Sequence, residues 1–99
     1  MSKPTPLTYP GLILQAEFFA PLGITQLAAA KATGIPQSRL SEILAGRRSI
    51  TADTAARLGR FFQVDPRSWL NLQATFDLRE MEHSDGRELA RVLPAEQVA

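Results

Sequence analysis

The chain contains no cysteine among its 99 residues. This absence excludes disulfide bonds and thiolate metal sites, and it gives no sign of export to an oxidising compartment. No apolar run approaches the roughly 18 residues needed to cross a bilayer. The opening segment MSKPTPLTYPG lacks the apolar stretch of a signal peptide. We therefore expect a cytoplasmic location.

Groups that would perform catalysis or hold a cofactor are also scarce. His83 is the only histidine, and a lone histidine in a polar stretch is far more often solvated than catalytic or metal-binding. Asp77, Glu80 and Glu82 fit a solvated helix end better than an acid–base pair or a hard-metal site. The sequence has no glycine-rich phosphate loop, nucleophile–base pairing or zinc-ligand spacing. We expect no enzyme activity, no metal, no cofactor and no small-molecule ligand.

Charge is nearly balanced overall but unevenly distributed along the chain. The formal net charge is +1. Residues 31–60 hold six basic side chains against two acidic ones, whereas residues 77–99 hold six acidic against three basic. A basic middle fits a surface that faces phosphate, with an acidic end pointing elsewhere. Chance asymmetry on a solvated surface explains the charge pattern equally well.

The spacing of apolar residues predicts helices and no strand, so we expect an all-α fold in one domain. Pro10-Gly11 opens the first helix, in which Leu14, Phe18 and Leu22 form one apolar stripe. Asp65-Pro66 is a strong start for the last helix, with an acid at the N-cap and proline at the first helical position. The expected organisation is a flexible N-terminal extension over 1–9, a helical domain over 10–82 and a polar C-terminal tail over 83–99.

Residues 25–46 hold the most informative pattern, two short helices joined by a tight turn. Thr25 suits the N-cap of the first, and Gly34 supplies the positive φ of a C-cap. In the second, Leu40, Ile43 and Leu44 form the inward face. This layout is typical of a helix-turn-helix, whose second helix lies in the DNA major groove.

An ordinary helical hairpin is the alternative explanation for this turn. Such hairpins are common in all-α domains, so the turn alone does not decide between the two. The polar start of the second helix and the Arg47-Arg48 pair after it favour DNA binding.

Two later helices carry features that need a packing explanation. Thr51 caps a helix containing Gly59, which costs about 1 kcal/mol relative to alanine and so suggests close packing there. The last helix bears two apolar stripes, and a lone terminal helix on a small domain cannot bury both in its own core. The second stripe, through Leu70, Ala74 and Leu78, could meet a symmetry mate. We assign a homodimer contact to Trp69, Leu70, Leu72 and Phe76.

Four segments carry a resemblance to a known family: Pro10-Gly11, PLGITQ at 21–26, GIPQSRLSEILAGRRSITADTAARLGRFF at 34–62 and DPRSWLNLQATFDLR at 65–79. They resemble the Cro/C1-type (XRE) helix-turn-helix family and, more narrowly, the HigA (VapI-like) antitoxins. The resemblance covers about residues 10–80, with ITADTAARL and SWLNLQATFDL as its distinctive segments. It implies a five-helix lambda-repressor-like DNA-binding domain and a homodimer on a palindromic operator near its own promoter. It also implies a small HigB toxin partner, similar to RelE, that cleaves mRNA.

The family pattern also implies the DNA contacts. One glutamine starts the first helix of the motif and would contact phosphate, while the polar start of the second helix would read bases or phosphates. Glutamine can pair with adenine and arginine with guanine, each worth about 1–3 kcal/mol of discrimination. The paired arginines of the following loop would neutralise backbone phosphates. The expected DNA-binding set is Gln26, Gln37, Ser38, Arg39, Ser41, Glu42, Arg47 and Arg48.

Two departures from ordinary DNA-binding chemistry or from the family pattern need an explanation. Glu42 would repel phosphate, so it either accepts from cytosine N4 or pairs with Arg39 three residues earlier, and we favour the pairing. Ala29 and Thr33 stand where the family commonly has large apolar residues, which predicts a thin core that Leu27 could compensate.

Two further functions stay open on the sequence. One is a stand-alone XRE repressor without a toxin, whose DNA chemistry would be the same. The other is a helical adaptor that binds only protein, against which the Gln37–Arg39 cluster and the loop arginines speak. The sequence does not give the operator sequence, the toxin-contact surface or the toxin's target.

Overall fold

A computed structural model describes residues 8–98, and within that range the chain folds into helices with no strand. The all-α prediction is confirmed. The predicted N-terminal extension, residues 1–9, lies almost entirely outside the described residues. Counting the first three segments as one continuous helix, residues 8–98 form five helices and a terminal 3₁₀ turn. The elements are α1 (Pro10–Leu14), η1 (Gln15–Phe19), α2 (Ala20–Leu22), α3 (Gln26–Thr33), α4 (Gln37–Leu44), α5 (Ala52–Phe62), α6 (Pro66–Leu89) and η2 (Ala95–Gln97).

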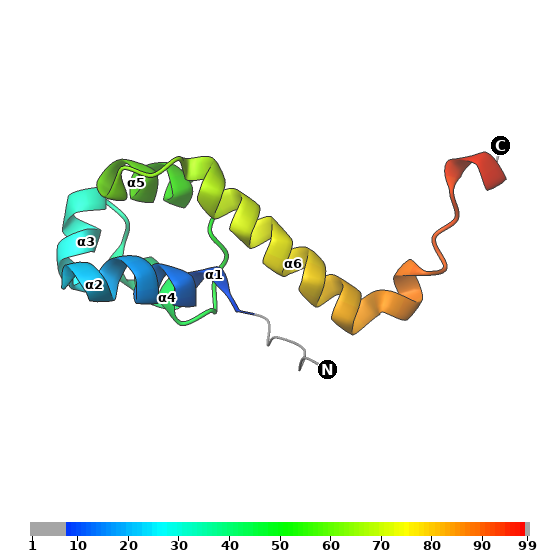
Figure 1. Ribbon diagram of the computed structural model, residues 1–99, viewed down its shortest axis with the longest axis horizontal. Coiled ribbons are helices and arrows are strands. Elements are labelled where there is room, and N and C mark those ends of the chain that lie inside the picture. The colour runs from blue at the N-terminus through cyan, green and yellow to red at the C-terminus, as the bar shows by residue number, and fades with distance from the viewer. Residues whose placement is uncertain (1–7, 99) are drawn as a thin grey trace.

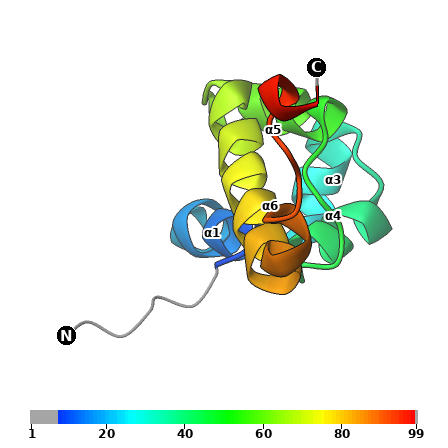
Figure 2. The ribbon, with the colours of Figure 1, turned by 90° about the vertical axis from the view of Figure 1, so that its right-hand side faces the viewer.

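The helical segments from α1 to α5 and the start of α6 pack into a body, and the rest of α6 projects away from it (Figure 1). Within the body α3 and α4 are neighbours, α1 packs on α4, and α5 packs on both α3 and α6. Figure 2 views the molecule from the projecting end, with α1 on one side of α6 and α3 and α4 on the other. The fully buried side chains come from all the helices of the body, and the largest are Phe19, Leu14, Ile35, Leu40, Ile43, Leu58 and Thr54.

The first helix has an apolar face different from the predicted one. Leu14 is buried and Phe18 partly buried as predicted, but Leu22 is 61% exposed, so its place in the stripe was wrong. The reason is the π-helical turn η1, which closes i to i+5 hydrogen bonds such as the one from Ala20 N–H to the Gln15 carbonyl. The wider turn brings Phe19, five residues after Leu14, into the core at 1% exposure.

The start of the first helix supports the second helix of the motif directly. A Cβ at Gly11 would collide with the carbonyl group of Ile43 and reach the Cα of Leu44. The backbones of α1 and α4 therefore touch at this point, which only glycine permits. The outward face of α4 is thus held from behind by both side-chain packing and a backbone contact.

The two helices of the motif are α3 and α4, joined by a turn at Gly34. Thr25 caps α3 by accepting from the Ala28 N–H at 3.1 Å, and Gly34 has φ 77° in the turn. Thr33 is buried and its hydroxyl is satisfied, because it donates to the Ala29 carbonyl at 2.7 Å and accepts from Ile35 N–H at 3.2 Å. Leu27 is 49% exposed, so the idea that it compensates for a thin core was wrong.

The last helix begins as predicted and continues further. Asp65 accepts from Arg67 N–H at 2.9 Å, with Pro66 at the first helical position. Trp69 is 3% exposed and packs edge-on against Phe18, with ring centroids 4.8 Å apart. The helix runs past residue 82 to Leu89, through Asp85 with non-helical φ −123° and ψ 23°.

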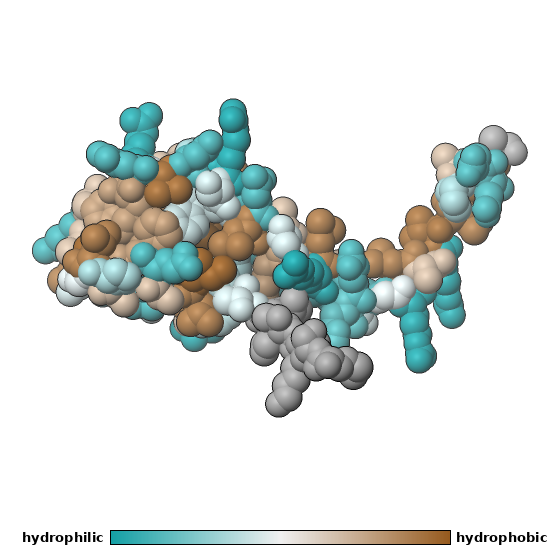
Figure 3. Space-filling model, viewed as in Figure 1, coloured by the Kyte–Doolittle hydropathy of each residue, from teal (hydrophilic) through white to brown (hydrophobic). Residues whose placement is uncertain are grey.

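Every residue from 77 to 98, a segment called the arm below, is exposed. Figure 3 shows hydrophobic and hydrophilic side chains interleaved along it. Its exposed apolar residues are Leu78, Met81, Leu89, Val92, Leu93 and Val98.

Among the described residues, no single helix has the length and apolarity required to cross a membrane. One bent pair, Pro10–Leu22 with Gln26–Thr33, passes that test together across a 99° bend, by length and composition only.

Candidate DNA interface

Helix α4 divides cleanly into a buried and an open side. Leu40, Ile43 and Leu44 are 0%, 1% and 7% exposed, which confirms the predicted inward face. Gln37 and Ser38 are exposed at the start of the helix. The packing of three apolar anchors fixes the rotation of α4, so its polar first turn must face solvent.

The first turn of α4 also presents backbone donors. Pro36 is the N-cap and makes no side-chain cap hydrogen bond. The first intrahelical bond of this turn is from Leu40 N–H to the Pro36 carbonyl at 3.1 Å. The N–H groups of Gln37, Ser38 and Arg39 precede it and have no helical partner. Such groups, together with the helix dipole, attract phosphate and other anions.

The remaining predicted polar contacts flank this turn. Gln26 is partly buried at the first position of α3, and Ser41 is partly buried one turn into α4. Within residues 8–98, the side chains of Gln26, Gln37, Ser38 and Ser41 have no hydrogen-bond partner in the protein, so their donors and acceptors are available to DNA.

The ion pairs of the interface differ from the predicted one. Glu42 accepts from Nε of Arg48 at 2.8 Å, and Arg39 instead donates through Nη1 to Oδ2 of Asp53 at 3.2 Å. The predicted pairing of Glu42 with Arg39 was therefore wrong. The physical reason is tertiary: α5 brings a carboxylate to Arg39, and the loop after α4 folds Arg48 back onto Glu42.

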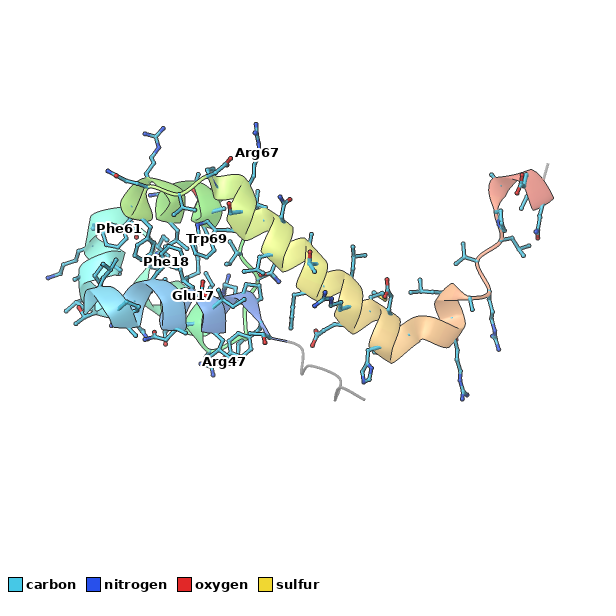
Figure 4. The ribbon with its side chains drawn as sticks, in the orientation of Figure 1. Glu17, Phe18, Arg47, Phe61, Arg67 and Trp69 are labelled. Atoms are coloured by element: carbon cyan, nitrogen blue, oxygen red, sulfur yellow. The ribbon has the colours of Figure 1, made fainter. Side chains whose placement is uncertain are left out.

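The two loop arginines have different surroundings. Arg48 and Arg39 line one open groove of about 310 Å³, together with Asp53. Arg47 is exposed and borders a smaller hollow of about 160 Å³ that includes Tyr9 and reaches the arm at Glu80. Figure 4 shows Arg47 at the edge of the molecule, on the opposite side from Arg67. Arg48 lines the smaller hollow as well, so it borders both the groove beside Arg39 and the hollow beside Arg47.

Three polar residues outside the predicted set organise this surface. They are Asp53, Arg57 and Gln73. Arg57 lies four residues after Asp53 on the same helix, a spacing that could have indicated their pairing. Gln73 is 8% exposed and accepts from Ile50 N–H at 2.9 Å, a partner 23 residues away for which the sequence has no signal.

Two neighbouring arginines affect the titration of Asp53. The hydrogen bond from Arg57 lowers the pKa of Asp53 below its usual value of 3.8, and the charge and hydrogen bond of Arg39 act in the same direction. Asp53 is therefore a carboxylate at neutral pH, with a formal charge shared by two guanidinium groups.

Comparison with known proteins identifies the family. A family model described as Helix-turn-helix matches residues 16–69, more than half of the chain. Virulence-associated protein I of Dichelobacter nodosus is 43% identical over 89 residues, covering 90% of this chain and 82% of that protein. The chain is a member of the XRE-type helix-turn-helix family. Its likeness to solved antitoxins places it in the HigA (VapI-like) group of that family.

Two solved structures carry that likeness. The Pseudomonas aeruginosa antitoxin HigA with the higBA promoter has a TM-score of 0.84 and 31% identity, covering 90% of this chain and 98% of that one. The antitoxin GraA in complex with its operator has a TM-score of 0.84 and 35% identity, covering 95% and 96%. The five-helix lambda-repressor-like fold expected from the sequence is thereby confirmed.

The four residues expected at the dimer contact of this HigA-family chain lie in different surroundings. Trp69 is buried against Phe18 in its own body. Leu70, Leu72 and Phe76 are partly exposed on α6. No group of three or more His, Cys, Asp or Glu in the described part of the chain could hold a metal ion.

Proposed function

We propose that this chain is the antitoxin of a type II toxin–antitoxin pair. It binds its own operator as a dimer, represses its operon, and neutralises a HigB-like toxin that cleaves mRNA. The observation that carries the DNA half is the open first turn of α4, where unpaired backbone N–H groups and free polar side chains meet Arg39 at a groove. The toxin half rests on membership of the HigA group.

In the proposed complex α4 enters the major groove. Gln37, Ser38 and Arg39 face base edges, where glutamine suits adenine and arginine suits guanine. Gln26 and the loop arginines meet phosphate, which fixes the register of the protein without reading sequence.

The test of this interface is binding to duplex DNA taken from immediately upstream of the gene. Affinity is expected to fall steeply as salt rises, because bound phosphates release counterions. Arg39→Ala should cost about 1–3 kcal/mol and relax recognition at one base step. Arg67→Ala is the matched control, since it removes the same charge on the opposite side from Arg47 (Figure 4). If Arg39→Ala binds each operator variant with the same affinity as the native chain does, Arg39 is not one of the residues that read bases.

The dimer is proposed to form through α6, where Leu70, Leu72 and Phe76 keep exposed surface and Leu78 continues the stripe. Two α4 helices would then reach half-sites about one helical turn of DNA, or a multiple, apart. Leu78→Glu should shift the chain toward monomer in sedimentation. Leu22→Glu is a control of equal exposure, since both leucines are 61% exposed. Dissociation by Leu22→Glu alone would move the contact to the first helix.

The toxin half is tested in bacteria with the short reading frame beside this gene. Inducing that neighbour alone should arrest growth, and co-expression of this chain should relieve the arrest. A neighbour that causes no arrest, or an arrest that this chain does not relieve, would leave a stand-alone repressor as the function. Operator binding would be the same in both cases, so the growth test alone separates them.

A further inference from the structure

Asp53 occupies an unusual place for an acid beside a surface proposed to face phosphate. It lies in the first turn of α5, and its carboxylate accepts from two arginines on different helices. Nη1 of Arg39, on α4, is 3.2 Å from Oδ2, and Nε of Arg57, on α5, is 3.0 Å from Oδ1. Each carboxylate oxygen thus holds one guanidinium group.

The Arg57 side of this arrangement continues into the turn of the motif. Nη1 of Arg57 donates to the carbonyl oxygen of Thr33 at 2.9 Å, at the last residue of α3. Gly34 makes room for it, because a Cβ there would come within 2.7 Å of that nitrogen. Asp53 is therefore fixed, through Arg57, to the turn that sets the position of α4.

The Arg39 side leaves part of the guanidinium group free. Only Nη1 is engaged within the described residues, so Nε and Nη2 form an unpaired edge. The side chain is 34% exposed and borders the groove of about 310 Å³ with Arg48 and Asp53. Two parallel N–H donors on one edge of a planar guanidinium match guanine O6 and N7.

We propose that Asp53 is a positioning residue for operator recognition: it holds Nη1 of Arg39 so that the opposite edge faces a guanine in the major groove. The inference rests on the proposed operator binding. A long arginine side chain has many rotamers in solution, and a fixed contact at one nitrogen removes most of them before DNA arrives. Asp53 itself touches no base. Asp53 is ionised at neutral pH, and the two arginines lower its pKa below 3.8.

The first variant is Asp53→Asn, which keeps the shape of the side chain and removes its charge. Its affinity for the upstream duplex should fall about 5- to 10-fold, with the loss confined to duplexes that carry the guanine read by Arg39. Its affinity for unrelated DNA should stay equal or rise, because a negative charge near phosphate has been removed. A purely structural role would lower both affinities together. Glu88→Gln, on the exposed arm, is the matched control for the change in charge and should leave discrimination unchanged.

A double-mutant cycle then asks whether Asp53 acts through Arg39. In an Arg39→Ala background, Asp53→Asn should have no further effect on discrimination, since the side chain that it positions is absent. Additive losses of discrimination in the double variant would overturn the inference. Asp53→Glu keeps the charge and moves the carboxylate by one methylene. It should fold and should change discrimination at the same base pair, so it takes the place of Asp53→Asn if that variant fails to fold.

The outcomes separate the inference from the function on which it rests. A native chain that shows no preference for the upstream duplex would overturn the proposed operator binding and the positioning role with it. A native chain that prefers the duplex, with Asp53→Asn discriminating equally well, would overturn the positioning role alone.

Discussion

The body and the arm follow different rules although one continuous helix joins them. In the body, α4 buries Leu40 and Ile43 almost completely, and α1 approaches it so closely that only glycine fits at residue 11. In the arm, no residue from 77 to 98 is buried, and Leu78 and Val92 are 61% and 70% exposed. The body therefore gets its stability from its own core. The apolar residues of the arm form no such core within the single chain.

The prediction with the largest expected effect replaces one leucine by alanine in each region. Leu40→Ala should lower the free energy of unfolding by about 2–5 kcal/mol, because the side chain is 0% exposed and its removal leaves a cavity. Leu78→Ala should change it by about 0.5 kcal/mol or less in the monomer, since that leucine is 61% exposed and has little packing to lose. Urea unfolding followed by circular dichroism measures both.

The leucine exchange can also fail in an informative way. An unchanged stability for Leu40→Ala would show that the rotation assigned to α4 is wrong. A loss for Leu78→Ala that disappears on dilution would show that a second copy of the chain covers the arm.

A pair of glycines tests the same contrast with a single added methyl group. A Cβ at Gly59 would come within 2.7 Å of the Val64 carbonyl oxygen, so Gly59→Ala should destabilise the chain by about 1–3 kcal/mol despite its better helix propensity. A Cβ at Gly86 meets nothing within 4 Å, so Gly86→Ala should be neutral or stabilise by up to about 1 kcal/mol. Melting temperatures that rise for both variants would show that the end of α5 adapts more freely than its packing indicates.

The starts of the helices could be predicted from the sequence because capping is local. Thr25 and Thr51 each accept from a backbone N–H three residues on, and Asp65 accepts from one two residues on. These contacts depend on a few neighbouring residues, so residue type and spacing identify them. The inward face of α4 was predictable for a similar reason, because three apolar residues within five positions leave one way to orient a short helix.

Features that depend on distant partners could not be predicted. The π-helical turn places Phe19 instead of Leu22 in the core, and the regular spacing of the apolar residues did not indicate this turn. Arg39 and Asp53 are 14 residues apart and meet only because α5 packs beside the motif. The predicted partner of Glu42 was wrong because the i, i+3 rule considers only residues of the same helix. The actual partner, Arg48, lies in the loop after α4. The candidate interface was thus foreseen as a set of residues, while its internal contacts required the fold.

The smallest expected effect is the contribution of the Asp53 charge to the free energy of unfolding, as distinct from the contribution of packing. The hydrogen bond from Arg57, then the charge and hydrogen bond of Arg39, lower the pKa of Asp53 from 3.8. A carboxylate with a lower pKa in the folded chain stabilises that state above its unfolded pKa, and the stabilisation is lost as pH falls through the folded pKa. Native chain and Asp53→Asn should therefore differ in unfolding free energy by a constant amount near neutral pH. The difference should shrink as the pH falls below 3.8.

The effect should be small because Arg39, Arg57 and Asp53 are 34%, 45% and 56% exposed, and water screens such pairs. Urea unfolding at a series of pH values measures it. A difference that persists unchanged into strong acid would mean that Asp53 contributes through its shape and neutral hydrogen bonds rather than through its charge.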